Sequence, residues 1–100
     1  MAFWNLNNLE ILKVSHNQLK IIPKDIAKLK ALRKLDMDFN QVAMVPAELS
    51  KLSKLEELHL RHNQLRKLQL DVSKMTKLRL IDVDENQIEN LGEDLQRLIH

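Results

Sequence analysis

Residues 55–68, LEELHLRHNQLRKL, contain the pattern that decides the fold. Leu58 and Leu60 are separated by one residue, and the side chains of a strand alternate between its two faces. The two leucines therefore point to one side of a strand, and His59 points to the other. Asn63 follows where the chain has to leave the strand, and an amide side chain can both donate to and accept from the backbone groups of a turn. The stretch predicts a short strand with one buried face, followed by a turn that Asn63 holds.

The same pattern occurs four times, and successive copies are offset by 23 residues without insertion or deletion. The other copies are LEILKVSHNQLKII (9–22), LRKLDMDFNQVAMV (32–45) and LRLIDVDENQIENL (78–91). A unit this short cannot bury its apolar face alone, so neighbouring units have to stack. We therefore expect a single domain over residues 1–100, made of repeats 9–31, 32–54, 55–77 and 78–100 after a partial repeat at 1–8.

These copies carry the signature L-x-x-L-x-L-x-x-N-x-L, and the sequence resembles the leucine-rich-repeat family in its 23-residue intracellular type. The continuation I-P-x-x-I-x-x-L at residues 22–29 is similar to the unit of scaffold proteins such as Scribble and Erbin, and of bacterial repeat proteins. The resemblance implies an α/β solenoid with a curved parallel sheet on the concave face and short helical or 3-10 turns on the convex face. The proline of this continuation is kept at Pro46, but Gln69 and Gly92 replace it in the last two repeats.

Composition excludes several classes of protein and of site. The 100 residues include no Cys, so a disulfide framework and a zinc site with Cys ligands are excluded. The first residues, MAFWNLNNLE, lack the basic start and apolar run of a signal peptide. No apolar stretch reaches the roughly 18 residues of a membrane-spanning helix, and a net charge of +2 is too small to indicate a nucleic-acid partner. We therefore expect a cytoplasmic protein with no membrane span.

Both ends of the stack are expected to be uncovered. Phe3 and Leu6 fall in the register of an apolar pair of the next repeat, so they resemble the tail of an earlier repeat. Trp4 is expected to lie across this N-terminal end. At the other end we expect no polar capping helix over three aliphatic residues, Leu91, Leu95 and Leu98. Uncovered aliphatic side chains favour self-association through the ends, and they are also typical of a piece cut from a longer array.

The outward positions of the strands are the candidate binding site. Stacking places residues 23 apart side by side, so these positions form columns across the concave face. Signs alternate along two columns, and opposite charges on neighbouring strands attract each other. In a third column Phe39 stands between His16 and His62, where it is either an apolar anchor for a partner or a ring folded over the strand edge. The expected partner-binding residues are Lys13, His16, Asp36, Asp38, Phe39, His59, Arg61, His62, Asp82 and Asp84.

The convex turns have a charge pattern of their own. Four acidic residues each precede a basic residue by three positions, which predicts ion pairs within helical turns. The pairs are Asp25–Lys28, Glu48–Lys51, Asp71–Lys74 and Asp94–Arg97. The convex side is net basic, and because charges of both signs are interspersed on it we interpret it as a solvated surface.

No pattern indicates an enzyme. The sequence contains no Gly-rich phosphate loop, no H-E-x-x-H motif and no Cys nucleophile. A metal held by His59 between Asp36 and Asp82 would lie on an open surface without supporting groups, so we expect no metal site. We likewise expect no cofactor and no catalytic residue.

The sequence therefore favours a protein–protein interaction module whose partner binds the concave sheet face. A charge ladder that only keeps the sheet soluble would use the same residues. Two further alternatives remain open. The chain could be an engineered or excised repeat fragment with no activity of its own, or a targeting or regulatory segment of a larger multidomain signalling protein or effector.

Overall fold

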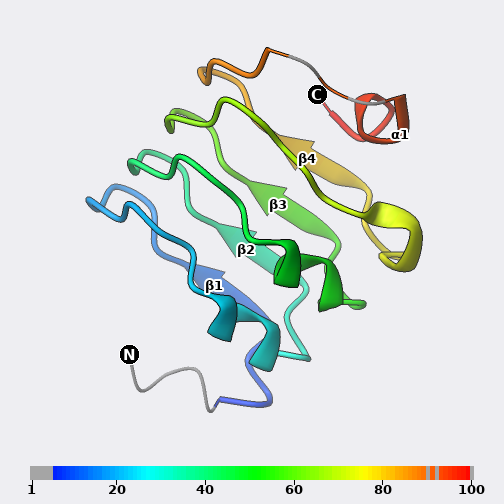
Figure 1. Ribbon diagram of the computed structural model, residues 1–100. Helices are drawn as coiled ribbons and strands as arrows, with labels where there is room; N and C mark the ends of the chain where they lie inside the picture. Colours follow the sequence, from blue (N-terminus) through cyan, green and yellow to red (C-terminus); the bar gives the residue numbers. More distant parts are fainter. Residues whose placement is uncertain (1–5, 90, 92, 100) are drawn as a thin grey trace.

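The computed structural model describes residues 6–89, 91 and 93–99, apart from the side chains of Glu93 and Asp94. Each repeat contributes one short strand and one outer turn, and these line opposite sides of the molecule (Figure 1). The strands are β1 (Ile11–Lys13), β2 (Lys34–Asp36), β3 (Glu57–His59) and β4 (Leu80–Asp82). The outer turns are the 3-10 helices η2 (Lys24–Lys28), η3 (Ala47–Lys51) and η4 (Val72–Lys74), followed by α1 (Glu93–Gln96).

The strands form one parallel sheet in the order β1-β2-β3-β4. Lys34 pairs with Glu57, so a step from one strand to the next is one repeat along the chain. Backbone hydrogen bonds between neighbouring repeats continue past the strand ends, for example from His16 N to Asp38 O at 3.0 Å and from Gln41 N to Leu19 O at 2.8 Å. The predicted leucine-rich-repeat solenoid, with its parallel sheet, is therefore confirmed.

The core between the sheet and the outer turns consists of aliphatic side chains. Leu58 and Leu60 point inward from the third repeat and are 0% exposed. Leu49 and Leu52 meet them from η3 and the position after it, and they are equally buried. None of the helices in the described residues is long and apolar enough to cross a membrane.

In the second, third and fourth repeats, the asparagine after the strand bonds the turn to the preceding repeat. Asn63 Nδ2 donates to Leu60 O and to Met37 O, both at 3.1 Å, and its Oδ1 accepts from Val42 N at 3.0 Å. The equivalent bonds are made by Asn40 and Asn86. Because buried backbone groups need partners, we assign this ladder of three stacked asparagines a structural role, as the sequence predicts.

The outer turns depend on the residues that precede them. Pro23 and Pro46 come directly before η2 and η3, with φ of −73° and −70°, which suits entry into a helical turn. Gln69 replaces this proline in the third repeat, where η4 has three residues instead of five. Asp71 caps η4 by accepting from Ser73 N at 3.0 Å. The predicted 3-10 turns are confirmed in three repeats, and the fourth has the α-helical turn α1.

The predicted ion pairs of the convex turns are mostly wrong. Lys28 Nζ lies 3.5 Å from Asp25 Oδ2, but the equivalent pairs of η3 and η4 are not formed in the described part of the chain. In η4 the carboxylate of Asp71 accepts from the Ser73 hydroxyl instead, at 2.6 Å. Exposed ion pairs contribute little, so a local cap can displace them. The fourth pair includes Asp94, whose side chain lies outside the described residues.

The C-terminal end is partly covered by the chain itself, which corrects the expectation of an uncovered end. Ile81 N donates to Leu98 O at 2.8 Å, and Ile81 forms a parallel bridge with Ile99 along the outer edge of β4. Leu95, in α1, is 5% exposed. The chain after α1 thus lies along the edge of the sheet, and these residues cover part of the apolar surface there.

The N-terminal end follows the predicted register. Leu6 O accepts from Leu9 N at 3.1 Å, and the equivalent bonds at the start of the later repeats have the same length. Leu6 is 51% exposed. The predictions for Phe3 and Trp4 fall outside the described residues.

Candidate functional site

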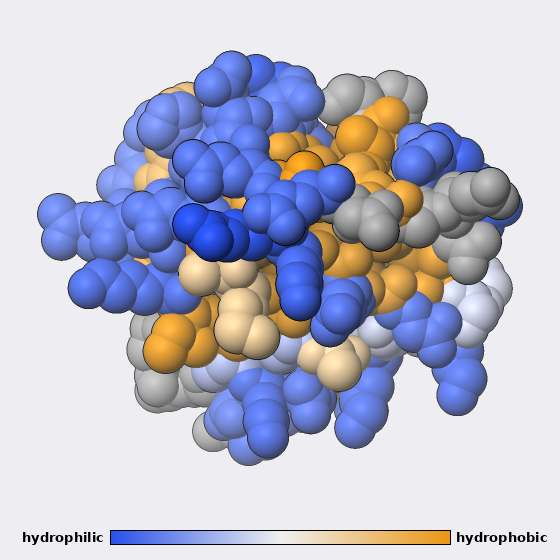
Figure 2. Space-filling model, turned by 45° about the horizontal axis from the view of Figure 1, so that its top comes forward, coloured by the Kyte–Doolittle hydropathy of each residue, from blue (hydrophilic) through white to orange (hydrophobic). Residues whose placement is uncertain are grey.

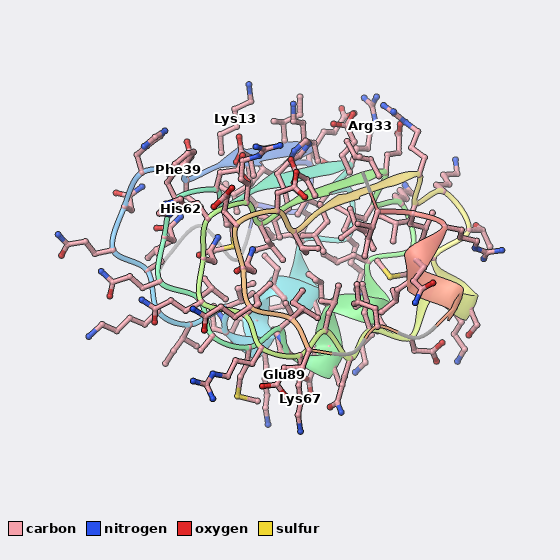
Figure 3. All side chains as sticks on the ribbon, turned by 90° about the horizontal axis from the view of Figure 1, so that it is seen from above. Lys13, Arg33, Phe39, His62, Lys67 and Glu89 are labelled. Carbon is pink, nitrogen blue, oxygen red and sulfur yellow. The ribbon has the colours of Figure 1, made fainter. Side chains whose placement is uncertain are left out.

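The concave face is the outward surface of the sheet. Figure 3 shows Lys13, Phe39 and His62 on this side of the molecule, with Lys67 and Glu89 on the opposite side. The predicted site residues do not form one continuous cluster. They separate into a charged network around Arg61, a stack of rings around Phe39, and a side-chain bond within β3.

Arg61 gathers three carboxylates on this face. Its Nε lies 3.2 Å from Asp82 Oδ2, and a terminal guanidinium nitrogen lies 3.2 Å from Asp84 Oδ2. The Arg61 backbone N–H donates to Asp38 Oδ1 at 2.7 Å. The side-chain bond to Asp82 is the main cause that raises the pKa of Arg61. Burial raises the pKa of the Asp38 carboxyl, because a partly desolvated charge is disfavoured.

Phe39 lies between two imidazole rings. Its ring centroid is 4.5 Å from that of His16 and 4.9 Å from that of His62, with interplanar angles of 9° and 20°. The side chain is 39% exposed. Phe39 is therefore neither a free anchor nor a ring folded on the backbone, because it is held in a stack with one part open to solvent.

A left-handed backbone conformation builds this stack. His16, Phe39 and His62 have φ of 57°, 58° and 59°, and Glu85 continues the column at 58°. Non-glycine residues disfavour this region, at a cost of order 1–3 kcal/mol each. The asparagine after each of them is bonded to the backbone of the turn and holds the conformation. Because each repeat makes the same turn, the side chains stand in line.

His59 turns toward Glu57 on its own strand rather than toward Asp36 or Asp82. Its Nε2 lies 2.8 Å from Glu57 Oε1, and a carboxylate can only accept, so His59 donates. This bond is the main cause that lowers the pKa of Glu57. Among the described residues, no group of three or more His, Cys, Asp or Glu side chains is arranged to hold a metal ion.

The side chains of Asp36 and Asp82 bond to the backbone that directly follows them. Each accepts through Oδ1 from the backbone N–H two residues later, at 3.1 Å. Lys13 is exposed beside Asp36, yet it makes no ion pair within the described residues. The column of Lys13, Asp36, His59 and Asp82 therefore contains no ion pair between its described side chains, because its carboxylates accept from local backbone and, at Asp82, from Arg61.

The sequence prediction missed a column of charges that stands just before the strands. Arg33 lies 3.0 Å from Glu10 Oε1 and 2.8 Å from Glu56 Oε2. Arg79 extends the column, at 3.8 Å from Glu56 and 2.6 Å from Glu57. The interval of 23 residues that reveals the other columns also relates Glu10, Arg33 and Glu56. Alternation along the strand does not indicate these residues, because each directly follows the first leucine of its repeat, before the alternating part begins.

Comparison with known proteins agrees with the repeat architecture. A family profile described as leucine rich repeat matches residues 1–42, and one described as leucine rich repeats (2 copies) matches residues 53–97. A solved leucine-rich-repeat protein of Leptospira interrogans is 31% identical, with a TM-score of 0.86. Internalin C2 of Listeria monocytogenes is 26% identical, with a TM-score of 0.74.

The two structures are longer than this chain. The match with the Leptospira protein covers 95% of this chain and 26% of that one, and the match with internalin C2 covers 98% and 44%. The chain thus spans about a quarter of the first protein and less than half of the second. No curated protein matches it.

Proposed function

Since the chain belongs to the leucine-rich-repeat family, we propose that it is a protein-binding module whose partner docks on the concave sheet face. Domains of this family generally mediate protein–protein interaction. The proposal gives the chain no catalytic role, and it needs no cofactor or metal. Its lack of cysteine supports the reducing cytoplasm as its compartment.

The stack of His16, Phe39 and His62 is the observation that carries the proposal. Aromatic residues are enriched at the centres of protein interfaces, where they gain from burial. The flanking imidazoles hold the Phe39 ring in one orientation, so little side-chain freedom is lost when a partner covers it. The stack therefore offers a partner a rigid aromatic anchor with an exposed part.

The charges beside the stack favour a partner that carries basic side chains. The predicted site contains two basic and four acidic residues, which gives a net charge of −2 with His neutral. Charges at the rim of an interface mainly set the association rate and the choice of partner. Arg61 restrains Asp82 and Asp84, so a basic partner meets carboxylates whose positions are already fixed.

Affinity capture with a paired set of variants tests the proposal. The concave variant combines Phe39→Asn with Asp84→Lys, because asparagine tolerates the positive φ of position 39 and the lysine repels a basic partner. The matched control combines Lys51→Glu with Lys74→Glu on the convex turns, where both lysines are exposed. We expect the concave variant to lose the proteins that the wild type and the control capture. Capture that survives the concave change and is lost in the control would place the site on the convex side.

A targeting or regulatory role within a larger signalling protein or effector is the second candidate. The chain spans only 26% and 44% of the two solved relatives, which supports this interpretation. Binding on the concave face would then direct a neighbouring domain to its target. An inert repeat fragment, in contrast, would capture no protein that depends on Phe39.

A further inference from the structure

The side of the solenoid away from the sheet carries a second surface, which combines apolar and basic residues. Ile21 is 72% exposed and Met44 is 76% exposed, the highest values among the large hydrophobic residues that the structure describes. They share one register position in adjacent repeats, and Lys67 takes this position in the next repeat. Figure 3 shows Lys67 on the side opposite the concave face. We call this surface the return face; it consists of Lys20, Ile21, Ala43, Met44, Arg66 and Lys67.

A hollow of about 720 Å³ lies within the return face, between the second and third repeats. Its lining includes Ala43, Met44 and Val45 from one repeat and Gln64, Arg66 and Lys67 from the next. Figure 2 shows hydrophobic residues reaching the molecular surface among hydrophilic side chains. The hollow is large enough to receive a side chain of a partner, which distinguishes this surface from a flat charged patch.

Backbone bonding between neighbouring repeats varies along the segment that lines the hollow. Gln64 N donates to Val42 O at 2.9 Å and joins the two repeats directly after the asparagine turn. Farther along, no backbone hydrogen bond joins Arg66 to Ala43 within the described residues, whereas Glu89 N reaches Arg66 O at 3.2 Å in the following pair of repeats. The equivalent bond between Ala43 and Lys20 is likewise absent among the described residues, so the hollow lies beside a segment that no backbone hydrogen bond joins to the preceding repeat.

The basic side chains of the return face have no acidic partner in the described part of the chain. Lys20, Arg66 and Lys67 are exposed, and none of them forms an ion pair with a described carboxylate. On the concave face, Arg33 and Arg61 are each paired with two carboxylates. The return face thus offers unpaired cations beside exposed aliphatic side chains.

We propose that the return face binds an acidic segment of another protein. An aliphatic side chain of this segment enters the hollow beside Met44, and its carboxylates pair with Arg66 and Lys67. The hollow beside Met44 and the unpaired cations together favour such a segment. A hollow next to apolar side chains can receive an aliphatic side chain, and unpaired cations attract carboxylates. A nucleic acid would leave the apolar residues without a role, since the return face contains no aromatic ring on which a base could stack.

A display library of random short peptides is the probe for this interaction. Peptides are selected on the immobilised chain, and their affinities are then measured by fluorescence anisotropy. One variant pair, Ile21→Ser with Met44→Ser, removes the apolar part of the return face, and a second, Arg66→Glu with Lys67→Glu, reverses its charge. The matched control is Ile11→Ser with Phe39→Asn, which removes two exposed apolar residues of the concave side. Circular dichroism checks that each variant folds.

We expect selected peptides that combine Asp or Glu with an aliphatic residue. Their affinity should fall about tenfold or more in each return-face variant, as expected from the loss of one anchor or a few charge pairs. It should stay within about twofold in the concave control and weaken as salt rises. Acidic peptides that bind the return-face variants as well as the wild type, or a selection without acidic peptides, would overturn the proposal.

Two further probes distinguish other occupants. Vesicles of phosphatidylcholine and phosphatidylserine test a lipid surface, and single-stranded DNA tests a nucleic acid. Binding of either probe that the return-face variants abolish, together with a failure to select acidic peptides, would replace the proposal. Because the concave face is altered only in the control, this test can fail without affecting the proposal for that face.

Discussion

His62 and Asn63 show how a single turn combines backbone strain with the bonds that compensate for it. His62 has φ of 59°, in a region that a ring-bearing side chain disfavours. Asn63 is 8% exposed and donates to Met37 O, Leu60 O and Arg61 O. Asn63 thereby stabilises the turn that orients the His62 ring toward the concave face. The fold and the candidate site therefore both depend on Asn63.

Replacement of Asn63 by Ala should lower the free energy of unfolding by about 1–3 kcal/mol, because it leaves buried backbone groups without partners. Asn17→Ala is the control. Asn17 is exposed and donates only within its own turn, to Val14 O at 2.9 Å and Ser15 O at 3.0 Å. Urea unfolding measures the stability of both variants. Equal losses of stability would show that the contribution of the asparagine does not depend on its burial.

Glu85 offers a direct measurement of the strain in the left-handed column. Its φ is 58° and its side chain is exposed, so a substitution changes mainly the backbone preference. Glu85→Asn should stabilise the fold by up to about 1 kcal/mol, since asparagine tolerates this region. Glu89→Asn, which is also exposed but has no positive φ, should change the stability little. A similar gain in both variants would attribute the effect to charge rather than to strain.

At the scale of the elements, the third outer turn shows what replaces a lost proline. In η4 the carboxylate of Asp71 accepts from both the backbone and the hydroxyl of Ser73. In η3 the start of the turn is Pro46, which makes no side-chain cap bond, and no described hydrogen bond involves the carboxylate of Glu48 at the register of Asp71. Similar 3-10 turns therefore arise from two different local causes.

Asp71→Ala should lower the urea midpoint of the chain, because it removes the cap that starts η4. Glu48→Ala, at the same register in η3, should leave the midpoint almost unchanged. The bond from the Ser73 hydroxyl is the main cause that lowers the pKa of Asp71, so the difference between the two variants should shrink in acid. Equal effects at neutral pH would mean that the bond to Ser73 does not stabilise the turn.

At the scale of the whole molecule, the interval of 23 residues predicts most of the architecture. Leu58 and its equivalents follow from alternation along a strand, and Asn63 follows from the hydrogen-bond demand of the turn. The interval does not predict which charged neighbours bond to each other. The side chain of Arg61 contacts both Asp82 and Asp84 in the next repeat, while His59 bonds to Glu57 on its own strand. A repeat interval places several charged groups at similar distances and does not determine which of them bond.

The features outside the repeat are equally hard to predict. The pairing of Ile81 with Ile99 breaks the periodic pattern, so no register arithmetic indicates it. The stack around Phe39 requires the left-handed turn, which the sequence alone does not reveal when no glycine marks it. The return face is not predicted from the sequence for a different reason. Ile21 and Met44 share a column with Lys67, and a mixed column suggests only a solvated surface.

The charge network gives the whole molecule a defined response to acid. Hydrogen bonds from His59 and from Arg33 are the main causes that lower the pKa values of Glu57 and Glu56. A carboxyl whose pKa is lower in the folded state binds protons more readily when unfolded. The stability that it contributes is therefore present above the ordinary carboxyl pKa of about 4 and is lost as the pH falls through the folded-state value. Asp38 acts in the opposite direction, because burial raises its pKa in the folded state.

Chemical unfolding across the acid range should separate these two contributions. Glu57→Gln should lower the stability at neutral pH and flatten its decline below about pH 4, because the variant has no proton to gain at this position. Asp38→Asn keeps an oxygen that can accept from Arg61 N, so it should raise the stability at neutral pH and steepen the decline in acid. The slope of stability against pH should therefore change in opposite directions in the two variants. This distinguishes Glu57, whose charged form is stabilised by hydrogen bonds, from Asp38, whose charged form is disfavoured by burial. Parallel pH profiles for the wild type and both variants would show that neither carboxyl links folding to pH.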